Sequence, residues 1–107
     1  MLNVAVDRNT WHRGKGLKGS RLLRPDGKKC CIGFLGIELG VCKKELLGLK
    51  VLGEVEVGAI ETFSLKHEIR LMRAYETNDD TKITEAVREA RLIDIGQGMN
   101  VNFSFIN

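Results

Sequence analysis

Apolar and polar residues alternate at both ends of the chain. In Leu2–Val6 and again in Val101–Phe105, every second residue is a large hydrophobic one and the residues between are small or polar. A period of two predicts a strand with one buried face. We therefore predict that these two strands pair in a small antiparallel sheet, with the intervening helices covering its apolar side.

The first predicted helix spans about residues 30–39, where the chain is apolar and small, and Gly40 is placed to end it. Gly33 and Gly36 lower the intrinsic helix propensity by about 1 kcal/mol each. Because these glycines destabilise the helix, their presence indicates that another part of the chain packs closely against that face. A shorter helical turn is predicted over residues 41–48, and it also ends at a glycine.

Two further helices are predicted in the second half of the chain. One starts with Ser64 as its N-cap and ends near Tyr75, and the other starts at Thr84 and stops at Gly96 or Gly98. In the former, apolar residues at i, i+4 and i+7 alternate with basic ones, which predicts an amphipathic helix. The apolar residues are Leu65, Ile69 and Met72, and the basic ones are Lys66, Arg70 and Arg73.

Together these elements predict an α+β fold in a single domain over residues 1–107, with a small antiparallel sheet that pairs the N- and C-terminal strands and about three helices packed on it. A chain of 107 residues buries a modest core without metals or disulfides. Residues 50–59 are ambiguous, because Val51, Val55 and Val57 favour a strand while the glycines favour an irregular connection.

The basic residues are concentrated in one part of the chain. The formal net charge is +3, yet residues 7–29 carry eight basic and two acidic residues, so this segment has a net charge of +6 and the remainder −3. Such an asymmetry indicates a localised anionic partner. Residues 11–20 form a glycine-rich loop and Pro25-Asp-Gly27 is typical of a turn. The candidate binding residues are Trp11, Arg13, Lys15, Lys18, Arg21, Arg24, Lys28 and Lys29.

Several motifs occur in a recognisable order. They are Asp7-Arg-Asn-Thr-Trp11, Ser20-Arg-Leu-Leu23, Gly27-x-x-Cys-Cys-x-Gly-Phe34, Asn78-Asp-Asp80, Arg88-Glu-Ala90 and Val101-Asn-Phe103. In this order the chain resembles short uncharacterised proteins of tailed phages and prophages, in which Cys-Cys-Leu-Gly stands where this chain has Cys30-Cys31-Ile32-Gly33. The resemblance implies a phage-type origin, and it implies no catalytic or binding residues.

Familiar catalytic and cofactor motifs are missing or incomplete. The cysteines Cys30, Cys31 and Cys42 lack the paired spacing of a zinc site, and no sequence signal brings a histidine base to Cys30. The glycines at 14, 16 and 19 spell the dinucleotide fingerprint, but no helix is predicted after them. Asp79 and Asp80 lack the spacing of a calcium loop. We therefore predict a protein that is not an enzyme and that uses no cofactor and no metal.

Two binding functions remain. The first is protein–protein interaction with a host or defence-system component, whose acidic patch meets the basic segment. The alternative is binding of nucleic acid or a nucleotide by residues 11–29, with Trp11 either stacking on a base or packing as a core anchor.

Free cysteines, the lack of a signal peptide and the lack of any long apolar run predict a cytoplasmic protein (host cytosol if phage-encoded) that does not enter a membrane.

Overall fold

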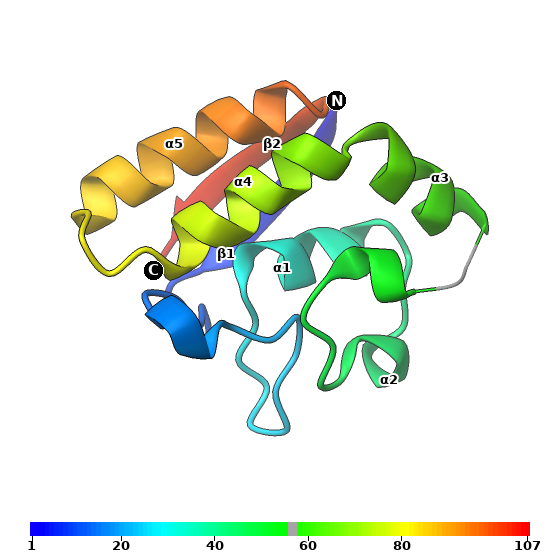
Figure 1. Ribbon diagram of the computed structural model, residues 1–107, viewed down its shortest axis with the longest axis horizontal. Coiled ribbons are helices and arrows are strands. Elements are labelled where there is room, and N and C mark those ends of the chain that lie inside the picture. Colours follow the sequence, from blue (N-terminus) through cyan, green and yellow to red (C-terminus); the bar gives the residue numbers. More distant parts are fainter. Residues whose placement is uncertain (56–57) are drawn as a thin grey trace.

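The computed structural model describes residues 1–55 and 58–107. Within these residues the chain forms two strands and five α-helices (Figure 1). In chain order the elements are β1 (Leu2–Asp7), the 3-10 turn η1 (Gly16–Lys18), α1 (Cys31–Glu38), α2 (Lys43–Leu46), the 3-10 turn η2 (Leu52–Glu54), α3 (Gly58–Lys66), α4 (Glu68–Asp79), α5 (Glu85–Gln97) and β2 (Val101–Ile106). The predicted α+β class is confirmed, whereas the described residues hold five α-helices and not about three.

The two terminal strands pair as predicted, but they run parallel, so the prediction of an antiparallel sheet was wrong. The register runs from Leu2 opposite Val101 to Asp7 opposite Ile106. Both strands start at the same end, where the Leu2 N–H donates to the Asn100 carbonyl at 3.1 Å. Alternation predicts which residues share a face, but strand direction follows from the connection, and parallel strands need a long crossover. Here all the helices lie in that crossover.

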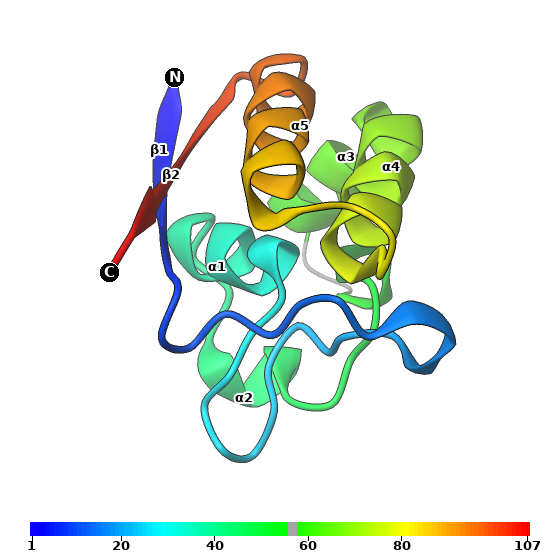
Figure 2. The same cartoon turned by 90° about the vertical axis from the view of Figure 1, so that its left-hand side faces the viewer.

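The elements stack in three layers (Figure 2). Helices α1 and α5 cover one face of the sheet, and α4 packs on both of these helices from the other side. The predicted alternation is confirmed by the burial of Val4, Val6 and Phe103, which point into the core while Ala5 and Ser104 are exposed. The sheet and the helices therefore share one apolar core.

Close packing explains the two glycines of α1. A Cβ atom at Gly33 would lie 1.8 Å from the carbonyl oxygen of Leu22, and one at Gly36 would lie 3.1 Å from the Leu46 side chain. The first distance is far below any van der Waals contact, so only glycine lets α1 pack against the segment before the turn. The expectation of a close neighbour on this face is confirmed.

The helix predicted from Ser64 to Tyr75 is two helices. Ser64 is buried inside α3 and does not cap it, because α3 already begins at Gly58, and the chain bends at His67 before α4 runs on to Asp79. Residues 50–59, which were ambiguous in sequence, contain η2 and the start of α3. Val57 lies outside the described residues.

The boundaries of α5 agree with their predicted signals. The Val87 N–H donates to the Thr84 hydroxyl oxygen at 3.2 Å, which is the expected N-cap. The helix ends at Gln97, and Gly98 follows as its C-cap.

Candidate functional site

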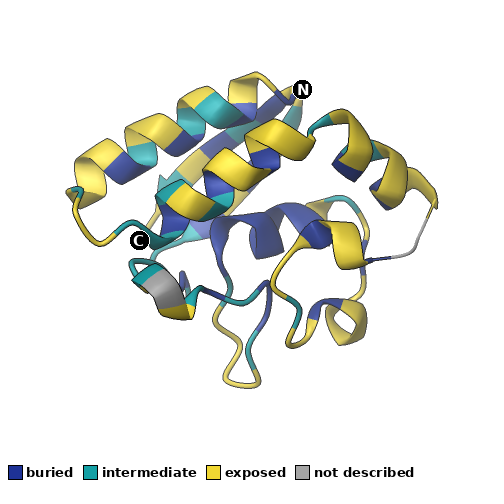
Figure 3. Cartoon of the chain, viewed as in Figure 1, coloured by how far each residue is buried: buried dark blue, intermediate teal, exposed yellow. Residues whose placement is uncertain are grey.

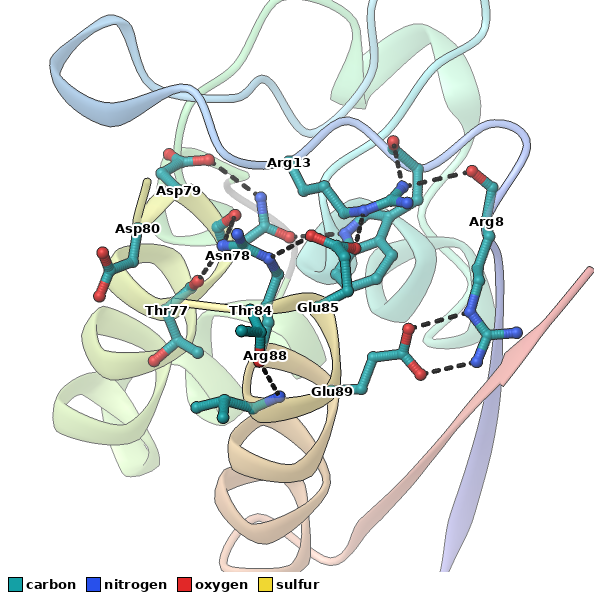
Figure 4. Close-up of polar contacts among 12 residues, drawn as sticks. Arg8, Arg13, Thr77, Asn78, Asp79, Asp80, Thr84, Glu85, Arg88 and Glu89 are labelled. Carbon is teal, nitrogen blue, oxygen red and sulfur yellow. Dashed lines mark hydrogen bonds and ion pairs between the residues drawn. The ribbon is translucent and has the colours of Figure 1, made fainter. Parts of the chain in front are cut away.

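The glycine-rich loop that carries the first basic residues is held against the end of α4 by one buried side chain, that of Asn78 (Figure 4). Its Oδ1 accepts from the Trp11 indole N–H at 2.7 Å and from the Cys31 backbone N–H at 3.0 Å. Its Nδ2 donates to the His12 carbonyl at 3.0 Å. Because indole and backbone N–H groups only donate and a carbonyl only accepts, these partners define the orientation of the amide. Asn78 thus joins the loop, α1 and α4 at one point.

A second set of contacts extends this junction to the far end of the loop. Both the backbone N–H and the hydroxyl of Ser20 donate to the Asp79 carboxylate, the former at 2.9 Å. Ser20 Oγ also accepts from Asn78 Nδ2 at 3.3 Å. The loop over residues 11–20 is therefore fixed near both of its ends by consecutive residues of α4. We call Trp11, His12, Ser20, Cys31, Asn78 and Asp79 the Asn78 cluster.

Ion pairs attach this loop and the residues just before it to α5 (Figure 4). The Arg8 guanidinium donates to both carboxylate oxygens of Glu89, at 2.9 and 2.6 Å. Glu85 pairs with Arg13 and, at 3.1 Å, with Arg88. Arg88 is buried and donates to the Asn78 carbonyl at 3.0 Å, so its charge is compensated within the protein.

The eight candidate binding residues divide into two groups. Trp11 is only 4% exposed, and the Arg13 guanidinium lies 4.4 Å from the centre of its ring, so the tryptophan packs as a core anchor. Arg24 bonds to His12 and pairs with Asp26 at 3.2 Å. The other candidates are not held in an ion pair within the described residues: Lys15, Lys18 and Lys28 are exposed, and Arg21 and Lys29 are partly buried.

The adjacent cysteines lie at the start of α1 and face the core. Cys30 is 2% exposed and Cys31 is fully covered, while Cys42 is exposed. Burial raises the pKa of Cys30 to about 12, and it also raises the pKa of Cys31. Both thiols are therefore protonated at neutral pH and covered, which is unsuitable for a nucleophile or a metal ligand. Among residues 1–55 and 58–107, no three His, Cys, Asp or Glu side chains gather where they would hold a metal ion.

The outer side of α3 and α4 is exposed (Figure 3), and it carries large apolar side chains. Leu65 is 70% exposed, Ile69 72% and Met72 54%. An amphipathic helix ordinarily turns its apolar stripe to the core. In α4, however, the core side is formed by Leu71, Ala74 and Asn78. We call Leu65, Ile69 and Met72 the apolar stripe.

Two pockets border the apolar stripe. One, of about 190 Å³, is lined by the residues of the α3–α4 bend, among them Leu65 and Ile69. The other, of about 200 Å³, lies between η2 and α4, where Val51, Met72 and Tyr75 line it. The stripe is therefore continued on one side by a shallow apolar hollow.

Comparison with known proteins gives no relative. No protein-family model, curated protein or solved structure matches this chain. Within the described residues, none of the helices is both long and apolar enough to cross a membrane.

Asn78 and Arg88 are central to the arrangement but were not among the candidate residues. The signal for Asn78 was present, because it lies seven residues beyond Leu71 and four beyond Ala74, on the buried side of α4. It was missed because the helix was predicted to end near Tyr75, before the polar residues Asn78, Asp79 and Asp80. For Arg88 no local pattern separates a buried arginine from an exposed one.

Proposed function

We propose that this protein works by binding a partner protein and that the apolar stripe is the centre of the contact. The observation that supports this function is the exposure of Leu65, Ile69 and Met72. Leu65 and Ile69 line one pocket at the α3–α4 bend, and Met72 follows Ile69 by three residues on α4. Monomeric soluble proteins rarely expose a contiguous group of large apolar side chains unless it serves recognition. The resemblance to phage proteins makes a host or defence-system component the expected class of partner.

Site-specific photo-crosslinking in the cells that make the protein tests this function. A photoreactive amino acid at position 72 should give covalent adducts with a distinct protein, and the same group at the exposed Lys82 should not. Ile69→Asp combined with the probe at position 72 should remove the adducts, because a charge in the stripe must be desolvated in any apolar contact. Equal adducts at both positions, or adducts removed by nuclease, would contradict the proposal.

A second candidate function is binding of nucleic acid by a basic face at the opposite end of the molecule. Here the turn that carries Lys28 and Lys29 lies beside α2 with Lys43 (Figures 1 and 2). The two segments are joined by the Gly48 N–H, which donates to the Leu23 carbonyl at 2.9 Å. Burial lowers the pKa of Lys29, and the nearby Lys43 ammonium lowers it further, which supports a concentration of positive charge at this face.

A salt titration with single-stranded and duplex oligonucleotides tests the second function. Binding by this face should weaken steeply as salt rises, and the double variant Lys28→Glu/Lys43→Glu should abolish it. Lys82→Glu/Arg91→Glu, two charge reversals at exposed residues elsewhere, lowers the net charge by the same amount and is the matched control. If the control variant loses as much oligonucleotide affinity as Lys28→Glu/Lys43→Glu, binding depends only on net charge and this face is not the binding site. Trp11 contributes no stacking in this account, since it is buried.

A further inference from the structure

The apolar stripe has a basic border on the side that faces α5. Arg70 and Arg73 lie three residues apart on α4, so they lie along one flank of Ile69 and Met72. Lys66 is the last residue of α3, just before the bend at His67. Arg70 extends over the end of α5, where a Cβ atom at Gly98 would lie 2.2 Å from its Nε. Lys66 borders a pocket with the same Gly98.

The third member of this border adds further positive charge. Arg73 lines a pocket between α4 and α5 together with Arg91 and the two carboxylates Glu76 and Asp94. None of the ion pairs found among the described residues involves Lys66, Arg70 or Arg73. We call these three residues the basic row. Within the described residues the basic row thus forms no ion pair, and it lies immediately beside exposed apolar side chains.

The opposite flank of the stripe has a different character. It carries Glu68, which lines the hollow between η2 and α4. Glu76 follows Met72 by four residues and continues the line of the stripe itself. The exposed surface is therefore apolar in the middle, basic along one side only, and acidic at the other side and at its end.

We propose that this surface binds an amphipathic helix of the partner protein, whose apolar face covers Leu65, Ile69 and Met72 and whose acidic edge lies along the basic row. The proposal rests on the proposed function and names the chemistry of the partner. A helix laid on an apolar stripe gains affinity from the buried side chains, and charges along its edge determine orientation and choice of partner. The three cations of the basic row therefore favour a partner helix whose carboxylates lie along the edge that faces this row.

Two other occupants fit the charges less well. An anionic membrane surface would attract the basic row, but it would meet Glu76 in the line of the stripe and Glu68 on its flank. A second copy that pairs its α4 antiparallel across a two-fold axis would place each flank against the same flank of its partner. The basic row would then face another basic row, and Glu68 would face Glu68.

Designed peptides test the proposal with the full chain. Two fluorescent helical peptides of about 18 residues share one leucine stripe and differ only in one edge, which carries glutamates in the first and lysines in the second. Fluorescence anisotropy measures both affinities at low and at high salt. The glutamate peptide should bind at least about tenfold more tightly at low salt, and the difference should shrink as salt screens the edge.

Variants assign the two parts of the surface. Ile69→Asp should abolish binding of both peptides, and because Ile69 is 72% exposed the substitution leaves the core intact. Lys66→Glu/Arg73→Glu should reverse the preference between the peptides, while Lys82→Glu should leave it unchanged. Circular dichroism and thermal unfolding check that each variant folds.

Each of the remaining outcomes overturns the proposal. Equal binding of both peptides, lost in Ile69→Asp, would leave the stripe as a protein-binding surface but remove the acidic helix, so the proposed function would survive. Binding of neither peptide would also reject the acidic helix, and the crosslinking experiment would then decide the proposed function separately. Self-association in sedimentation that Ile69→Asp removes would identify a second copy, and Ile69-dependent binding to phosphatidylserine vesicles without peptide binding would identify a membrane surface.

Discussion

Replacing Asn78 with alanine should destabilise the protein by about 3 kcal/mol or more. The substitution leaves three buried groups without their partner, namely the Trp11 indole N–H, the Cys31 backbone N–H and the His12 carbonyl. Each buried group that loses its partner costs about 1–3 kcal/mol, which gives the lower limit of the estimate. Since a domain of this kind is stable by only about 5–15 kcal/mol, the loss removes a large part of the total.

Urea unfolding measures this loss. Trp11 is the only tryptophan in the chain and lies in the Asn78 cluster, so its fluorescence follows the loop, and far-UV circular dichroism follows the helices. If both signals change together with an unchanged dependence on urea, the shift in midpoint reports the free energy of unfolding directly. Asn9→Ala is the matched control, because Asn9 is exposed and its replacement should cost less than about 0.5 kcal/mol.

A second substitution tests the orientation of the amide. Asn78→Asp keeps the size of the side chain but replaces the donor to the His12 carbonyl with a carboxylate oxygen next to Asp79. At neutral pH this variant should be at least as unstable as Asn78→Ala. A loss below about 1 kcal/mol in Asn78→Ala, or an Asn78→Asp variant as stable as the natural chain, would refute the assignment of Asn78 as the residue that holds the loop.

Three further results are expected. Gly33→Ala should prevent stable folding because its Cβ would meet the Leu22 carbonyl at 1.8 Å, whereas Gly58→Ala, at a helical glycine with nothing within 4 Å, should unfold at the same temperature or higher. Alkylation at neutral pH should modify Cys42 alone, with the two adjacent thiols reacting only after unfolding; mass spectrometry of intact and digested protein checks the sites. His12 has a pKa lowered by burial and then by Arg24, so the unfolded chain binds its proton more readily. Stability should therefore fall as pH drops below about 6.5; His12→Gln should reduce this slope in urea unfolding at about pH 7.5 and 5.5, and an unchanged slope would contradict the assignment.

Local patterns predicted most of the secondary structure, because their causes are local. Alternation placed both strands, Thr84 placed the start of α5, and the glycines of α1 correctly indicated a close neighbour. The division between α3 and α4 at His67 was missed, since nothing in the sequence near that residue resembles a stop signal.

The candidate site was predicted only in outline. The charge asymmetry identified the basic segment, but it could not show that Arg13 and Arg24 are engaged in ion pairs while Lys15, Lys18 and Lys28 remain exposed. Arg24 pairs with Asp26, two residues along the chain, but the partner of Arg13 is Glu85, far away in the sequence. No local pattern specifies a partner of that kind.

Local patterns in the chain were enough to predict which residues of each strand share a face, where most helices lie and which segment carries the positive charge. The parallel direction of the strands, the exposure of Leu65, Ile69 and Met72 and the burial of Asn78 became visible only in the folded chain. The physical reason is the same in both cases. A periodic pattern shows which residues share a face, because backbone geometry sets the period. The direction of a strand, and which face of a helix is buried, depend instead on the distant segments that pack against them.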